Sequence, residues 1–145
     1  MRNFRNYEIW QHAVDLAVSV SALCDGFPKY ELFALGDQLR RASVSISSNI
    51  AEGASRTSVL EFAHYLEISI GSAFEVETQL LIAKKRNYIT DEDYEKLVTE
   101  LQSLERQINT FISKLRPKAN SQSNSQPPIT IWNKTTNSQN PIAKS

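Results

Sequence analysis

Residue types that commonly carry out chemistry are few in this sequence of 145 residues. The two histidines, His12 and His64, have no second histidine or cysteine at metal-ligand spacing, and carboxylates are the only other ligand types within one helical turn. A metal site in a helical bundle needs several such groups that project inward from different helices. The sequence also lacks a glycine-rich phosphate loop and a Ser-His-Asp or Cys-His signature. It therefore predicts no metal, no cofactor and no enzymatic activity.

One pattern leaves a catalytic alternative open. Some four-helix ribonucleases use an arginine, a polar residue directly after it and a histidine at least one helical turn later. Arg5, Asn6 and His12 come near this pattern, but the histidine stands one residue too far along. The pattern also lies at the start of the first helix rather than on a late one. Ribonuclease activity is therefore the least supported of the functions we consider.

The segment DQLRRASVSISSNIAEGASR, residues 37–56, is unusually polar for a helix, with serines at positions 43, 45, 47 and 48. Arg40 and Arg41 point about 100° apart around the helix axis, so they lie on different strips of its surface. Small serine side chains let a second surface approach, which can be a neighbouring helix, another subunit or a phosphate backbone. The alternative is that the serines only cover a solvated face.

Two polar residues fall on apolar seams. Asn49 occupies a core position by its spacing, and Glu77 stands among apolar residues of the third predicted helix. A buried amide or carboxylate is costly unless it is hydrogen-bonded or paired. We expect Asn49 and Glu77 to form a polar element of the core that specifies packing or assembly. We also expect Glu77 to pair with Arg40, Arg41 or Asn49.

Four amphipathic helices must position these residues. Apolar residues recur at alternating intervals of three and four in segments of about 7–25, 28–53, 58–86 and 90–115, and no strand-like alternation competes. Gly26 and Gly53 are expected to end the first two helices. Ser58 or Thr57 is expected to cap the third helix, and Thr90 the fourth. Short connections favour antiparallel neighbours. The predicted fold is all-α, an up-down-up-down four-helix bundle over residues 1–116.

The remaining residues, 117–145, form a tail rich in Asn, Ser, Gln, Thr and Pro. This composition is typical of disorder. Ile129–Trp132 is its only apolar cluster, which either docks onto the bundle or a partner or has no structural role. The tail has three lysines and no acids, so residues 1–116 carry 13 basic and 16 acidic residues. A neutral chain does not by itself indicate a nucleic-acid-binding protein.

Further observations bear on location and redox chemistry. Cys24 is the single cysteine, and its apolar neighbours indicate a core thiol. No segment approaches the length of about 20 apolar residues that a membrane span needs. The N-terminus lacks the features of a signal peptide. We therefore expect a cytoplasmic protein.

Four segments resemble the four-helix bundle family of 23S rRNA intervening-sequence proteins, also called the S23 family. They are FRNYEIWQHAVDLA, FPKYELFALGDQLRRASVSISSNIAEGASR, EFAHYLEISIGSAFEVETQLLIAKKRNYI and LERQINTFISKLR. The resemblance covers about residues 4–116 and excludes the tail. It implies no enzymatic activity, since none is generally assigned to the family, many of whose members are encoded within insertions in large-subunit rRNA genes. A related member, the accessory variability determinant of diversity-generating retroelements, forms a pentameric ring and binds nucleic acid and a reverse transcriptase.

By this resemblance we expect a homopentamer. Its subunit contacts would use small residues of the second helix and a second apolar line on the first, which includes Trp10, Val14 and Cys24. Such a ring would repeat each basic patch five times and so bind RNA despite the neutral chain. The candidate nucleic-acid-binding residues are Arg40, Arg41, Arg56, Lys84, Lys85 and Arg86.

Two alternatives remain open for this surface. Lys84–Arg86 could equally complement the dipole at the end of the third helix. Arginines without aromatic stacking partners would hold backbones rather than read bases. The predicted function is RNA binding or binding to a nucleic-acid-processing partner such as a reverse transcriptase. The alternative is a protein–protein adaptor that does not contact nucleic acid.

Overall fold

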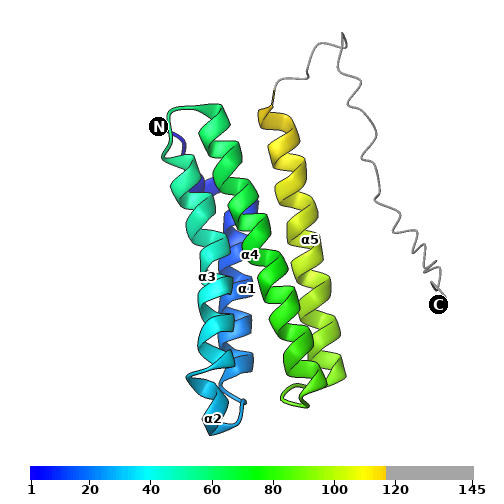
Figure 1. Ribbon diagram of the computed structural model, residues 1–145. Coiled ribbons are helices and arrows are strands. Elements are labelled where there is room, and N and C mark those ends of the chain that lie inside the picture. Colours follow the sequence, from blue (N-terminus) through cyan, green and yellow to red (C-terminus); the bar gives the residue numbers. More distant parts are fainter. Residues whose placement is uncertain (117–145) are drawn as a thin grey trace, which may run out of the picture.

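Four long helices run side by side in alternating directions around a shared apolar core (Figure 1). The computed structural model describes residues 1–116. After a short 3₁₀ helix, η1 (Phe4–Asn6), the helices are α1 (Glu8–Cys24), α2 (Lys29–Leu32), α3 (Leu35–Ala54), α4 (Val59–Lys85) and α5 (Asp91–Leu115). The predicted all-α bundle is confirmed. The tail of residues 117–145, with Ile129–Trp132, lies outside the described residues.

The starts of α4 and α5 follow capping signals in the sequence. The Ser58 hydroxyl accepts a hydrogen bond from the backbone N–H of Glu61 at 3.4 Å. The Thr90 hydroxyl accepts one from the backbone N–H of Asp93 at 3.1 Å. Each bond satisfies a donor that the helix itself leaves free. Both predicted caps are therefore confirmed.

The second predicted helix is divided into two, which the sequence did not indicate. α2 ends after one turn, and Phe33 and Ala34 separate it from α3. The Glu31 carboxylate accepts a hydrogen bond from the backbone N–H of Leu35 at 3.3 Å. This bond satisfies a free donor at the start of α3 and so stabilises the break.

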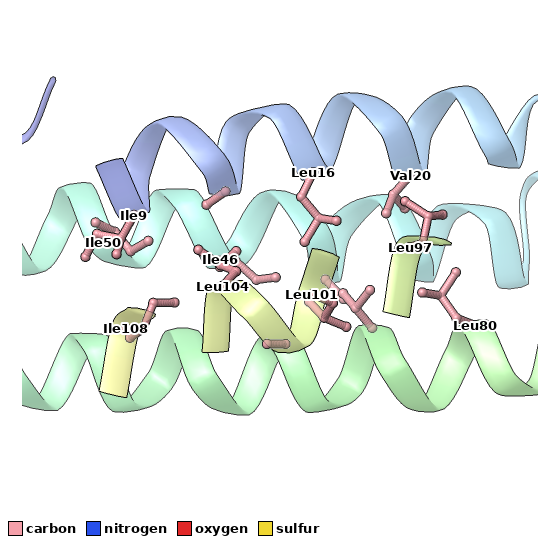
Figure 2. Packing of buried hydrophobic residues seen from close by; sticks show 14 of the residues in the cluster. Ile9, Leu16, Val20, Ile46, Ile50, Leu80, Leu97, Leu101, Leu104 and Ile108 are labelled. Carbon is pink, nitrogen blue, oxygen red and sulfur yellow. The ribbon is translucent and has the colours of Figure 1, made fainter. Parts of the chain in front are cut away.

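Aliphatic side chains from all four long helices fill the core, and they occupy the predicted seams. Figure 2 shows them directed toward one another between the helices. The labelled residues, all of them buried, are Ile9, Leu16 and Val20 of α1, Ile46 and Ile50 of α3, Leu80 of α4, and Leu97, Leu101, Leu104 and Ile108 of α5.

The serines of α3 allow close packing within the chain. Ser45 Oγ lies 2.9 Å from Ser72 Oγ of α4, and the buried Ser69 of α4 donates to the backbone oxygen of Ile46 at 2.9 Å. Side chains this small bring the two helices close enough for direct hydrogen bonds. The sequence left open whether the small serines make room for a neighbouring helix, another subunit or a phosphate backbone. The structure shows the first of these, a neighbouring helix.

α3 ends at Ala54, one residue after Gly53, so the helix ends where it was predicted to within one residue, but Gly53 itself is helical and has no positive φ. A Cβ atom at this position would lie 2.7 Å from Cβ of Tyr65 and 2.9 Å from Cδ2 of Phe62. The absence of a side chain at Gly53 is what allows α4 to pack against the last turn of α3.

The outer side of α4 carries several large apolar residues between polar ones such as His64, Glu67 and Glu75. Ile68, Phe74, Leu81 and Ile82 are exposed there, with Phe74 at 57% and Ile82 at 45% of full exposure. A surface helix in a globular protein normally turns a polar face outward. No helix within residues 1–116 is both long enough and apolar enough to cross a membrane.

Candidate nucleic-acid interface

Five of the six predicted nucleic-acid-binding residues lie at one end of the bundle. Arg40 and Arg41 are in the first two turns of α3, and Lys84–Arg86 are at the end of α4. Figure 1 shows that α2 and the turn between α4 and α5 lie at this end, which we call the α2 end. Arg56 lies at the opposite end, after α3. The predicted residues therefore do not form a single patch on one chain.

The turn after α4 positions two residues of the α2 end. Asn87 adopts φ 59°, in the left-handed region that asparagine tolerates better than most residues. Its N–H donates to the oxygen of Lys84 at 2.9 Å, and the N–H of Tyr88 donates to the oxygen of Ala83 at 2.9 Å. These bonds form a Schellman motif, which closes the helix end. The motif holds Arg86 and Tyr88 next to each other.

A hydrogen-bonded chain links this turn to α2. Arg86 Nε donates to the Tyr88 hydroxyl at 3.2 Å, and that hydroxyl donates to Glu31 Oε1 at 2.9 Å. Loss of hydration raises the pKa of Tyr88, and the hydrogen bond to Tyr88 raises the pKa of Arg86. Tyr88 therefore stays protonated and Arg86 stays charged at physiological pH. Since Glu31 also caps α3, the network connects three elements of the α2 end.

Arg40 is held by contacts within its own chain. Its Nη2 lies 2.8 Å from Oδ1 of Asp25 after α1, and its Nη1 donates to the backbone oxygen of Leu32 at 3.4 Å. These contacts connect α3 to the end of α1 and to α2. Burial raises the pKa of the nearby Cys24 thiol to about 11, with Arg40 acting in the opposite direction. The prediction of a buried cysteine is confirmed.

Lys84 and Arg56 also have partners within the chain. Lys84 Nζ lies 3.9 Å from carboxylate oxygens of both Asp91 and Glu95 on α5. Arg56 forms a salt bridge with Glu52 at 2.9 Å and donates to the Tyr65 hydroxyl at 2.5 Å. Arg40, Arg56 and Lys84 are thus partly neutralised by the fold itself.

The other three predicted cations extend into solvent. Arg41, Lys85 and Arg86 are exposed, and none of them takes part in a salt bridge within residues 1–116. All three belong to the α2 end. Their charges are therefore available to an external anion, with little desolvation cost.

Sequence reasoning missed the aromatic residues of this end. Tyr30 is 70% exposed and Phe33 is 85% exposed. The expectation that the arginines lack aromatic neighbours was wrong for two of them. The guanidinium carbon of Arg86 lies 5.6 Å from the centroid of the Tyr88 ring, and at the opposite end that of Arg56 lies 4.7 Å from the centroid of the Tyr65 ring. The signal was the spacing of Tyr30 and Phe33, three residues apart directly after Pro28, which places them near each other on a helical turn.

Asn49 and Glu77 are half-buried and lie on different seams. Asn49 Nδ2 donates to the backbone oxygen of Ser45 at 2.8 Å and to its hydroxyl at 3.0 Å. Glu77 Oε1 instead accepts from Gln102 Nε2 of α5 at 3.2 Å. The predicted pairing of Glu77 with Arg40, Arg41 or Asn49 is therefore wrong, because Glu77 faces α5 and not α3.

Glu105 of α5 is a second carboxylate close to Glu77 of α4. Burial raises the pKa of Glu105, and the charge of Glu77 raises it further. Oε1 of Glu105 is buried and has no hydrogen-bond partner within residues 1–116. Two neighbouring carboxylates of which one lacks a partner are electrostatically unfavourable.

The histidines show no catalytic arrangement within residues 1–116. His12 Nδ1 lies 2.7 Å from the carbonyl oxygen Oε1 of Gln107, and both residues line a groove between α1 and α5. His64 lies 4.0 Å from Glu67 on the outer side of α4. In the described part of the chain, no group of three or more His, Cys, Asp or Glu residues could hold a metal ion.

Comparison with known proteins agrees with the fold. A family model described as 23S rRNA-intervening sequence protein matches residues 5–110. Among solved structures, the chain is similar to a protein of unknown function from the S23 ribosomal protein family of Bacteroides thetaiotaomicron. The two share 25% sequence identity with a TM-score of 0.67, and the match covers 72% of this chain and 97% of the other. No curated protein matches the chain.

Proposed function

The chain belongs to the family of 23S rRNA-intervening sequence proteins, and on this premise we propose that it is a non-enzymatic bundle that assembles with copies of itself and binds RNA. The observation that carries the proposal is the combination of two surfaces. The outer side of α4 carries exposed large apolar residues, and the α2 end carries exposed cations, Arg41, Lys85 and Arg86, that form no salt bridge within residues 1–116. The first surface suits assembly and the second suits a polyanion.

The outer side of α4 supports self-association in two ways. Phe74, Leu81 and Ile82 are all exposed within about two turns of α4, and large apolar residues exposed this close together are less common on monomers than single ones. Gly71 lies between Ile68 and Phe74 in the sequence, and a Cβ atom at its position would meet no other atom within 4 Å. Glycine inside a helix costs about 1 kcal/mol relative to alanine, and packing within residues 1–116 gives no reason for it. A second copy that approaches this face closely gives one.

α4 thus replaces α1 as the surface that we assign to subunit contacts. The expected second apolar line of α1 is largely covered by its own chain. Trp10 is half-buried, with its ring 5.1 Å from that of Phe4, and Cys24 is buried. The pentamer expected from the resemblance stays a prediction, as does a cytoplasmic location.

RNA binding is supported by the position of the cations and by the family. Arg41, Lys85 and Arg86 are exposed at the end of the bundle. Arg41 is on α3 and Arg86 follows α4, so contacts along α4 leave these two accessible, whereas Lys85 lies one turn after Leu81 on the same helix. A neutral chain attracts a polyanion weakly, and repetition of the cations in an oligomer compensates for this. The description of the family refers to 23S rRNA, which makes structured RNA the first ligand to examine.

Assembly is tested by size-exclusion chromatography with light scattering over a range of protein concentrations. We expect an oligomer for the wild-type protein and a shift to monomer for Phe74→Glu and Ile82→Glu. Val18→Glu is the matched control, because Val18 is 65% exposed on α1 and away from α4. A wild-type monomer at all concentrations would refute the assembly proposal.

RNA binding is tested by filter binding to structured RNA over a salt series. We expect Arg41→Ala, Lys85→Ala and Arg86→Ala to weaken binding, and each variant should reduce the salt slope by about one for every phosphate that its side chain neutralises in the wild-type protein. Lys114→Ala is the control, since Lys114 lies in the last turn of α5 at the opposite end. No binding by the wild-type protein at low salt would refute RNA binding.

The adaptor function is the second candidate, and the apolar side of α4 is the observation that favours it. An adaptor would use this face for a different protein and would not bind RNA at any salt concentration. A partner such as a reverse transcriptase stays a prediction, because self-assembly would occupy the α4 face and RNA the α2 end. Ribonuclease activity is tested by RNA cleavage before and after His12→Ala, and we expect no cleavage in either case.

A further inference from the structure

Two aromatic side chains at the α2 end are exposed to a degree that the fold does not require. Tyr30 and Phe33 are 70% and 85% exposed, and Phe33 is the most exposed aromatic residue among the exposed apolar residues of the described chain. Tyr30 is in α2, and Phe33, three residues later, directly follows the last residue of that helix. Large apolar rings that protrude next to one another commonly mark a binding surface.

The Tyr30 ring rests on an ordered base. Its centroid lies 6.3 Å from that of Tyr88 in an edge-to-face arrangement. Tyr88 in turn packs against the buried Phe27 at 5.7 Å and donates its hydroxyl hydrogen to Glu31. One side of Tyr30 is therefore supported by the fold while most of its surface faces solvent. A ring held this way loses little conformational freedom when a ligand stacks on it.

Two cations belong to the surroundings of Tyr30, and the acids of α2 and of the end of α1 have partners. Arg86 donates to Tyr88, which contacts Tyr30, and Lys29 adjoins Tyr30 in the sequence and is exposed. Glu31 accepts from Tyr88 and from the backbone of α3, and Asp25 is paired with Arg40. The acids at the start of α5 limit the basic area to the α2 side of the turn.

We propose that the α2 end binds unpaired RNA, with the rings of Tyr30 and Phe33 stacked on bases and with Lys29, Lys85 and Arg86 on the flanking phosphates. The proposal rests on the RNA-binding function proposed above and specifies its ligand as single-stranded segments. Aromatic rings beside cations are the common means of binding single strands without sequence preference. Bases of a duplex stack on each other and are not accessible to such rings.

Fluorescence anisotropy with labelled single-stranded oligouridine of about 12 nucleotides, a length within the range of known single-strand sites, tests this ligand. A duplex of the same length is the second probe. We expect tighter binding to the single strand. Tyr30→Ala and Phe33→Ala should each weaken that binding about tenfold, within the range known for removal of one stacking ring. Binding to the duplex should stay unchanged in both variants.

Conservative variants separate stacking from a general structural effect. Tyr30→Phe and Phe33→Tyr keep a ring and should bind the single strand like the wild-type protein. Val44→Ala removes an exposed apolar side chain of α3 and should have no effect on either probe. Lys85→Ala should weaken binding to both probes, because phosphates are common to them. Unfolding midpoints by circular dichroism should be unchanged for Phe33→Ala, whose ring is largely in solvent.

Two results would overturn the proposal and leave RNA binding intact. One is equal or tighter binding of the wild-type protein to the duplex, and the other is unchanged single-strand binding in both alanine variants. Absence of binding to either probe and to structured RNA at low salt would overturn RNA binding as a whole. In that case the exposed rings belong to a protein-binding surface.

Discussion

Replacing the glycines of α3 and α4 by alanine gives a direct test of how closely these helices pack. In Gly53→Ala the new Cβ would lie 2.7 Å from Cβ of Tyr65 and 2.9 Å from Cδ2 of Phe62. The first of these atoms cannot move without its backbone. In Gly71→Ala the new Cβ meets nothing within 4 Å. Gly71 is in the middle of α4 and Gly53 is the last residue but one of α3, so the gain in helix propensity is larger for Gly71→Ala.

The expected magnitudes follow from these distances. The propensity gain is about 1 kcal/mol in the helix interior at Gly71 and smaller than this at Gly53, in the last turn of α3. Overpacking of a tight interface costs about 1–3 kcal/mol, and contacts this short place Gly53→Ala at the upper end of that range. We therefore expect Gly71→Ala to stabilise the fold by up to about 1 kcal/mol. Gly53→Ala should destabilise it by about 1–2 kcal/mol after the propensity gain is subtracted.

Urea unfolding followed by far-ultraviolet circular dichroism measures both changes. Each variant is measured at several protein concentrations, because self-association through α4 would make the unfolding midpoint depend on concentration. The comparison uses the lowest concentration, at which light scattering shows the smallest species. If Gly53→Ala is as stable as the wild-type protein, α3 and α4 do not approach each other as closely as the structure indicates.

Three further predictions concern single side chains. Since burial and Glu77 raise the pKa of Glu105, this carboxyl stabilises the fold below its ordinary pKa and loses that contribution as pH rises through its folded-state pKa. Glu105→Gln should therefore raise the unfolding midpoint at neutral pH, and the gain should vanish near pH 4, about where the unfolded carboxyl titrates. Asn87 has a positive φ, so Asn87→Gly should keep or raise the stability of the fold. Asn87→Val should lower it by about 1–2 kcal/mol, because valine disfavours a positive φ. Thermal unfolding of the two variants measures both changes. The Cys24 thiol, with a pKa of about 11, should react with a disulfide reagent at pH 8 only on unfolding, and fast reaction of the folded protein would contradict its burial.

Local patterns were sufficient to predict the helices, because each signal lies within one element. Ser58 and Thr90 cap helices through residues three positions away, so the sequence alone contains the interaction. The break between α2 and α3 is different. It depends on whether the Glu31 carboxylate caps the next helix or leaves the chain to continue, and the apolar period is compatible with both.

The errors about the candidate site share one physical cause. Periodicity shows that Glu77 is on the apolar side of α4, but it does not show which neighbouring helix that part of the side faces. Whether Glu77 meets Arg40 of α3 or Gln102 of α5 depends on the hand of the bundle, which sets the side of α4 on which each of these helices lies. In the same way, Arg40 meets Asp25 because the end of α1 and the start of α3 come together in space. Tertiary packing therefore decided which cations remained free for a ligand.

Assembly along α4 and RNA binding at the α2 end are linked by geometry. In the expected ring, with the bundles side by side and parallel, equivalent ends come together, so Lys85 and the aromatic rings of several copies would lie at one end of the assembly. An RNA long enough to reach two copies would then bind with higher apparent affinity than a short one, since the second contact is intramolecular. Phe74→Glu should therefore weaken binding of long RNA strongly and binding of a short oligonucleotide little, although no cation is altered. Equal losses for the two lengths would mean that each bundle binds RNA alone, and the neutral charge of the chain would then have to be overcome within a single copy.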